Sequence, residues 1–176
     1  PAATLHQAFE AQVAKTPQSA ALIFENVRLS YQQLNQQANQ LADFIQSQYH
    51  QRYQQAMAAG TPIALYLDRS VTMVVSILAV LKAGGAYVPL SPEHPKARSE
   101  FILNDIQAPF VLTDSVYAPK LRDWLSQLEL LNTKVLIAAQ LPQDLAAQNI
   151  NSPLTLQSCA TDLAYVIYTS GTTGQP

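Results

Sequence analysis

The sequence predicts an α/β fold in which a largely parallel sheet is flanked by helices. Short, continuous apolar runs recur from residue 62 onward, as expected of strands that are buried on both faces of a sheet. The segments between these runs repeat apolar residues at helical spacing, and strands that alternate with helices form parallel sheets. The predicted strands are 63–67, 86–90, 110–113, 134–138 and 163–168.

The first thirty residues predict a helix followed by a β-hairpin. Thr4 and Gln7 have the spacing of a capping box, in which side chains and backbone N–H groups pair at a helix start. Pro17 ends this helix. Residues 20–24 and 27–31 are short β-type runs around a two-residue turn, which indicates a hairpin. The apolar face of the helix is predicted to hold Leu5, Ala8, Phe9 and Val13.

A second amphipathic helix follows the hairpin. Ser30 and Gln33 form another capping box at its start. The segment is rich in glutamine, which can also be typical of a low-complexity tail. An apolar period runs through it, so we favour the helix, with most glutamines facing water. The periodic residues are Leu34, Ala38, Leu41, Ala42 and Ile45, and the glutamines are Gln32, Gln33, Gln36, Gln37 and Gln40.

Three further helices are predicted between the strands of the sheet. Ser70 can cap a helix over 71–82, which Gly84 and the glycine after it would close. Pro95 suits the first turn of a helix that runs to about residue 106. The last predicted helix covers 121–130, and its apolar face is expected to hold Leu121, Trp124, Leu125 and Leu128.

Composition excludes several classes of protein. Ten Lys and Arg stand against twelve Asp and Glu with the signs interspersed, so we expect no nucleic-acid partner. Cys159 is the only cysteine, which excludes an intramolecular disulfide. The longest apolar run, residues 71–81, is too short for a membrane span, and no signal peptide is visible. We therefore expect a cytoplasmic protein without a membrane partner. His6 and His50 are expected to face solvent, and His94 to lie at a helix entry.

One segment has a composition suited to chemistry. The predicted strand 163–168 leads directly into six residues rich in glycine and hydroxyl groups: Thr169, Ser170, Gly171, Thr172, Thr173 and Gly174. Backbone N–H groups and hydroxyls at the carboxyl end of a parallel strand can hold an anion, and phosphate suits such a site. The spacing is not that of the common P-loop. Taken alone, the same composition also fits a flexible turn.

The longer pattern around this segment resembles a known signature. Residues 168–176 are similar to the AMP-binding motif of the adenylate-forming enzymes, a superfamily of acyl-CoA synthetases, luciferases and peptide synthetase adenylation domains. Residues 29–39 resemble the first core motif of that superfamily, and 81–90 with Pro95 and Arg98 resemble the second. The second motif and Asp68-Arg69-Ser70 are characteristic of the amino-acid-activating branch. Departures are Ser91 for the usual Asp, His94 for the usual Tyr, and a longer connection over 49–61.

The resemblance implies the large N-terminal subdomain of an amino-acid adenylation domain of a nonribosomal peptide synthetase. Such a ligase joins an amino acid to ATP, gives an aminoacyl-adenylate, and passes it to phosphopantetheine on a carrier domain. Residues 169–174 would then hold the ATP phosphates, with Mg²⁺ nearby and Thr169 as its candidate ligand. No catalytic residue is assigned within the chain. Carrier and condensation domains are the partners that the resemblance implies.

The family pattern continues beyond Pro176, so residues 1–176 are expected to be the N-terminal portion of an adenylation domain. We expect this portion alone to be inactive and to self-associate through uncovered sheet. Two other interpretations stay open. One is a free-standing acyl- or aryl-acid ligase of the same superfamily, making CoA esters or adenylates. The other is a non-catalytic interaction module. The identity of the amino acid is not encoded in these residues.

Overall fold

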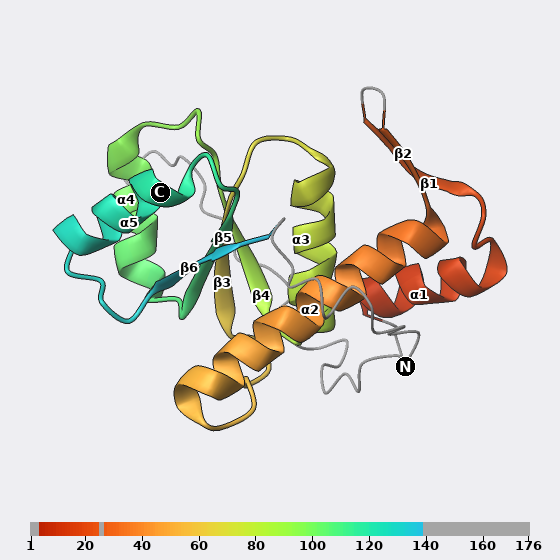
Figure 1. The fold of residues 1–176 in the computed structure, drawn as a ribbon, viewed down its shortest axis with the longest axis horizontal. Coiled ribbons are helices and arrows are strands. Elements are labelled where there is room, and N and C mark those ends of the chain that lie inside the picture. Colours follow the sequence, from red (N-terminus) through yellow and green to blue (C-terminus); the bar gives the residue numbers. More distant parts are fainter. Residues whose placement is uncertain (1–3, 25–26, 139–176) are drawn as a thin grey trace.

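The structure is a computed structural model that describes residues 4–24 and 27–138. After a first helix and two consecutive strands, the described chain alternates helices and strands (Figure 1). The order is α1 (Leu5–Lys15), β1 (Ala20–Phe24), β2 (Val27–Ser30), α2 (Tyr31–Tyr53), β3 (Pro62–Tyr66), α3 (Val71–Lys82), β4 (Ala86–Leu90), α4 (Lys96–Ile106), β5 (Phe110–Thr113), α5 (Ala118–Gln127) and β6 (Lys134–Ile137).

Both predicted capping boxes are confirmed. The backbone N–H of Gln7 donates to Thr4 Oγ1 at 3.3 Å, and the backbone N–H of Thr4 donates to Gln7 Oε1 at 2.9 Å. Ser30 and Gln33 make the same reciprocal pair at the start of α2. The strands β1 and β2 pair antiparallel, which confirms the hairpin, and this hairpin extends away from the main sheet (Figure 1).

The main sheet is parallel, as the sequence predicts. Its strand order is β4-β3-β5-β6, and every pair is parallel. The chain passes from β3 to β4 on one side, then crosses back to place β5 on the other side of β3. The loops that follow β3 and β5 therefore lead in opposite directions. Such a reversal is a topological switch point, where open α/β sheets commonly bind ligands.

Two apolar cores cover the two faces of the sheet. Helices α2 and α3 pack on one face, and α4 and α5 pack on the other (Figure 1). Strand β3 contributes side chains to both cores, because successive side chains in a strand point to opposite faces. Ile63 and Leu65 belong to the first core, and Ala64 and Tyr66 to the second. Trp124 joins the second core with Leu121 and Leu125, as predicted.

Three differences from the sequence prediction concern helices. His6 is buried rather than solvent-facing, with only 3% of its surface exposed, whereas Leu5 is exposed. Ala8 is exposed as well, whereas Phe9 packs against the first core and Val13 is half-buried, as predicted. Helix α2 continues to Tyr53, through residues predicted as part of a long connection. Helix α5 begins at Ala118 rather than Leu121, because Pro119 suits the first turn of a helix.

Several predicted features lie outside the described residues. These are the strand 163–168, Cys159, and the phosphate-loop residues Thr169, Ser170, Gly171, Thr172, Thr173 and Gly174. Within the described residues, no helix has both the length and the apolar character needed to cross a membrane.

Candidate functional site

The loops that leave the carboxyl ends of β3, β4 and β5 lie along one edge of the sheet, since the strands are parallel. The sequence shapes the first of these loops by helix capping. Ser70 Oγ accepts from the backbone N–H of Met73 at 3.1 Å and donates to the carbonyl of Asp68 at 3.0 Å. This confirms Ser70 as the cap of α3 and fixes the turn that presents Asp68 and Arg69.

A hydrogen bond joins the two loops that diverge at the switch point. The Tyr117 hydroxyl donates to Asp68 Oδ2 at 2.9 Å. Asp114 positions the tyrosine, because its Oδ1 accepts from the backbone N–H groups of Val116 and Tyr117 at 3.0 and 2.9 Å. The bond to the Asp68 carboxylate raises the pKa of Tyr117 to about 12. The phenol therefore stays protonated and remains a donor at neutral pH.

An aromatic group with a lysine lies next to this bond. Lys120 Nζ lies 4.6 Å from the centre of the Trp124 ring and donates to the Tyr66 hydroxyl at 3.0 Å. The Tyr66 ring meets those of Tyr117 and Trp124 edge to face, at 5.2 and 5.7 Å between centres. Cation–π contact and edge-to-face packing each stabilise such an arrangement. The loop after β5 is thereby anchored to the end of β3.

A cavity of about 410 Å³ opens at the ends of β3 and β4. Its polar lining includes Asp68, Arg69, Ser91 and Glu93, and Met73 and Leu90 are among its apolar residues. Side chains of both charge signs therefore surround the same space. Of these, Asp68, Arg69 and Ser91 belong to segments that the sequence singled out. Tyr117 and Glu93 were missed, since neither follows a pattern that signals a site.

The second motif of the resemblance, residues 81–90, builds the turn from α3 into β4. Gly84 has a φ of +86°, a conformation that side chains with a Cβ rarely adopt. A Cβ on Gly85 would meet the carbonyl oxygen of Thr61 at 3.0 Å. Both glycines are thus required by the backbone, and the predicted closure of α3 is confirmed.

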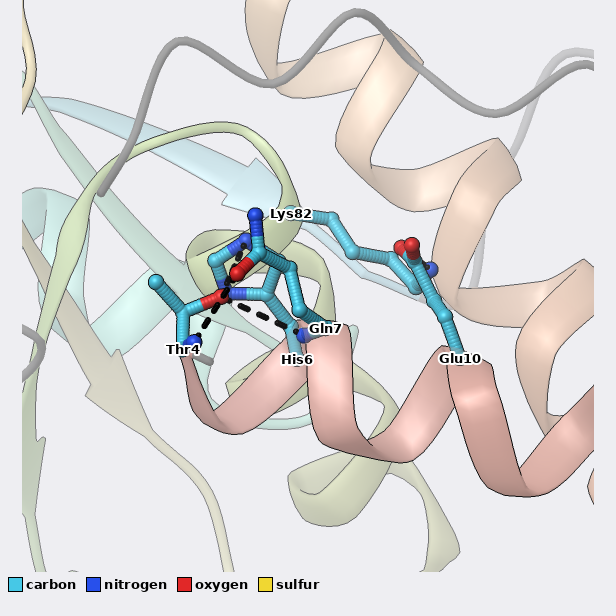
Figure 2. A network of polar contacts seen from close by, with 5 residues as sticks. All are labelled: Thr4, His6, Gln7, Glu10 and Lys82. Carbon is cyan, nitrogen blue, oxygen red and sulfur yellow. Dashed lines mark hydrogen bonds and ion pairs between the residues drawn. The ribbon is translucent and has the colours of Figure 1, made fainter. Parts of the chain in front are cut away.

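A buried polar cluster lies where α1 packs on α3 (Figure 2). Lys82 Nζ pairs with Glu10 Oε1 at 2.5 Å, and the lysine side chain is only 1% exposed. His6 Nε2 lies 3.3 Å from Thr4 Oγ1. Burial lowers the pKa of both Lys82 and His6; the carboxylate of Glu10 opposes this lowering in each case. His50, by contrast, is exposed as predicted.

The described residues contain no group of three or more His, Cys, Asp or Glu side chains that could hold a metal ion. Thr169, the predicted Mg²⁺ ligand, lies outside them.

The switch point, the parallel strands and the polar cavity at their carboxyl ends define a doubly wound α/β ligand-binding domain. The chain belongs to the AMP-binding enzyme family, whose model matches residues 9–176. That match includes the predicted phosphate loop.

The curated relatives that the chain matches are much longer proteins named as synthases. The chain is 41% identical over 176 residues to N-(5-amino-5-carboxypentanoyl)-L-cysteinyl-D-valine synthase of Penicillium rubens, covering 100% of this chain and 4% of that protein. It is 41% identical over 177 residues to tyrocidine synthase 3 of Brevibacillus parabrevis, covering 98% and 2%. Gramicidin S synthase 2 of Brevibacillus brevis is 39% identical over 173 residues, with 98% and 4% covered. The chain therefore spans only a small part of the relatives that it matches.

Solved structures agree with the fold. The nonribosomal peptide synthetase FmoA3 superposes with a TM-score of 0.76 at 29% identity, covering 97% of this chain and 16% of that one. The N-terminal subdomain of Klebsiella oxytoca NpsA, in complex with 3-hydroxyanthranilyl-AMSN, gives a TM-score of 0.75 at 25% identity, covering 99% and 39%. The predicted fold class, the large N-terminal subdomain of adenylate-forming enzymes, is thus confirmed.

Proposed function

We propose that residues 1–176 act as the N-terminal portion of an amino-acid adenylation domain in nonribosomal peptide synthesis. The match of the AMP-binding family across residues 9–176 carries this proposal. The three relatives at 39–41% identity point to the amino-acid-activating branch. All are named as synthases, and two are the tyrocidine and gramicidin S synthases. The second core motif, residues 81–90, points the same way.

The reaction would join a carboxylate to ATP. A carboxylate oxygen attacks the α-phosphorus, the bond from that phosphorus to the oxygen bridging to the β-phosphate breaks, and pyrophosphate leaves with that oxygen. The enzyme's task is to position the reactants and to neutralise developing charge. A neighbouring structure of FmoA3 is described as bound to AMPPNP, an ATP analogue. This supports ATP as the nucleotide.

The loop of residues 169–174 would hold the β- and γ-phosphates through its N–H groups and hydroxyls. The sequence places it directly after a predicted strand, and loops after parallel strands lie at the carboxyl edge of the sheet. Asp68 and Tyr117 lie at that edge. Mg²⁺ would share the phosphate charge, with Thr169 as its candidate ligand.

The partners and location follow from the same proposal. The adenylate would pass to phosphopantetheine on a carrier domain, and a condensation domain would use the loaded amino acid. Relatives of which this chain spans 2 to 4% leave ample length for such domains. The cytoplasm is the proposed location.

Amino-acid-dependent exchange between ATP and pyrophosphate tests the function. The complete natural protein that carries this chain is assayed with each common amino acid, and with benzoate and 3-hydroxybenzoate as aryl acids. We expect exchange with one or a few amino acids and none with the aryl acids. Exchange only with an aryl acid would favour the free-standing acyl- or aryl-acid ligase instead. No exchange with any acid would favour the non-catalytic interaction module.

A further inference from the structure

A second cavity, of about 470 Å³, lies at the opposite edge of the sheet from the candidate site. It opens where β6 begins, beside the last turn of α2 and one side of α5. Arg52, Arg122 and Lys134 contribute its charge, one from each of α2, α5 and β6. Among the described residues that line it, no Asp or Glu occurs. Three of the ten Lys and Arg residues of a weakly acidic chain therefore meet at one place.

Two of these cations are held in place by the fold. Arg52 donates to the carbonyl oxygens of Pro109 at 3.4 Å and Leu131 at 3.3 Å, which ties the end of α2 to the loops before β5 and β6. Lys134 Nζ donates to Gln48 Oε1 at 3.1 Å. These bonds are made to neutral oxygens, so the positive charges are not neutralised by them.

Arg122 differs from the other two. Within residues 4–24 and 27–138, its guanidinium makes no hydrogen bond or ion pair, and its side chain is exposed. A guanidinium presents its donors in a planar fork that matches a carboxylate. Arg122 is thus available for an anionic partner group.

Apolar side chains make up much of the rest of the lining. Leu130 and Val135 are 7% and 8% exposed and form part of the wall. Leu131 lies at the rim with 79% of its surface exposed, the largest exposure among the large apolar residues described. A partner that pairs with the neighbouring cations and covers Leu131 would bury apolar surface as well as charge. A small anion alone would leave Leu131 in water.

We propose that this basic cavity, lined by Arg52, Arg122, Lys134 and Leu131, binds an acidic segment of a partner polypeptide. The segment carries at least two carboxylates beside one leucine-sized side chain. The carboxylates pair with Arg122 and Lys134, and the apolar side chain covers Leu131. Charge complementarity selects this occupant. Relatives in which this chain makes up 2 to 4% of the length show how much additional polypeptide accompanies such a domain. The proposal does not depend on the adenylation activity.

Binding of a defined probe tests the proposal. The complete natural protein is titrated into fluorescein-labelled, end-capped Glu-Glu-Leu-Glu-Glu, and anisotropy is read at about 50 mM and about 300 mM salt. We expect saturable binding that weakens at the higher salt. Arg122→Glu should weaken binding at least tenfold, about 1.4 kcal/mol. Lys134→Gln should weaken it severalfold. Arg28→Glu, the same charge change at an exposed position on β2, should leave it unchanged.

The controls distinguish the proposed partner from other anions. End-capped Gln-Gln-Leu-Gln-Gln should not bind, and inorganic phosphate that replaces the salt at constant ionic strength should not displace the acidic probe. Binding that is equal in wild type and Arg122→Glu overturns the proposal. So does the absence of binding at low salt, displacement by phosphate alone, or a labelled oligouridylate that binds with the same dependence on Arg122. A thermal melt shows that each variant is folded.

Discussion

The carboxylate of Glu10 lies 2.5 Å from the ammonium of Lys82. This ion pair joins α1 to the last residue of α3, across 72 positions of sequence. The lysine is almost fully buried, and burial lowers its pKa while Glu10 opposes the change. The Phe9 ring lies beneath the ammonium, with its centre 5.9 Å from Nζ. A charged contact therefore fixes how the N-terminal helix packs on the body of the domain.

Removing one partner of this pair should cost more stability than removing both. Glu10→Gln leaves the Lys82 ammonium buried without its counter-charge, and we expect a loss of about 3 kcal/mol in the free energy of unfolding. Replacing both residues by Met should recover most of that loss, because no uncompensated charge remains. Urea unfolding at neutral pH measures both variants. If Glu10→Gln unfolds at the same urea concentration as wild type, the pair does not hold α1.

The buried His6 should make stability depend on pH. Its folded pKa lies below 6.5, chiefly because burial disfavours the imidazolium, so the unfolded chain binds a proton more readily than the folded one. The contribution of His6 to the free energy of unfolding is complete above pH 6.5. It is lost as the pH falls from 6.5 through the lower pKa of the folded state. The neighbouring Lys82 charge also lowers the pKa of His6, whereas the Glu10 carboxylate raises it.

We therefore expect the unfolding free energy of wild type to fall between about pH 7 and about pH 5, and to fall less in His6→Asn. His50→Asn is the matched control, because His50 is exposed, and it should retain the wild-type slope. Denaturant unfolding at a series of pH values provides the comparison. Equal slopes for His6→Asn and wild type would contradict the assignment.

The bond from Tyr117 to Asp68 should be visible in a tyrosine titration. With the carboxylate in place, the pKa of Tyr117 is about 12. Asp68→Asn removes the charge that holds the proton, so this pKa should fall toward the ordinary value of about 10. NMR of ring-labelled tyrosine follows the change, and Tyr117→Phe identifies the resonance. Asp123→Asn, an exposed carboxylate on α5, should leave the titration unaltered.

The strands and helix starts could be predicted from sequence because their signals are local. Continuous apolar runs identified β3 to β6, and capping boxes identified the starts of α1 and α2. The buried polar cluster of His6, Glu10 and Lys82 could not be predicted, because it forms only when α1 packs against α3. Glu10 and Lys82 do give one weak signal, since each places a charge beside an apolar helix face. The bond between Asp68 and Tyr117 spans 49 positions and has no local signature at all.

The extent of α2 shows a different limit of sequence reasoning. Residues 49–61 are predicted from sequence as a long connection. The helix continues because Tyr49 packs edge to face on Phe110, 6.3 Å between ring centres, and Arg52 reaches the loops before β5 and β6. Tertiary contacts thus extend a helix that its own periodicity does not require. The predicted phosphate loop is the converse case: a local sequence motif predicts it, and it lies outside the described residues.

The final prediction concerns that loop in the complete natural protein. Thr172→Ala or Thr173→Ala removes a hydroxyl that we expect to donate to a phosphate oxygen of ATP. Bonds of this kind contribute about 1.5–3 kcal/mol each. The apparent affinity for ATP in the exchange reaction should therefore fall roughly ten- to a hundredfold. The melting temperature should change little, because a phosphate loop is exposed before ATP binds.

If these residues form only a structural turn, the reverse is expected: each variant melts at a lower temperature and its ATP dependence is unchanged. Ser115→Ala, an exposed hydroxyl in the loop after β5, serves as the control and should alter neither quantity. A threonine variant that melts early but keeps normal ATP kinetics would remove the phosphate-binding assignment of these residues.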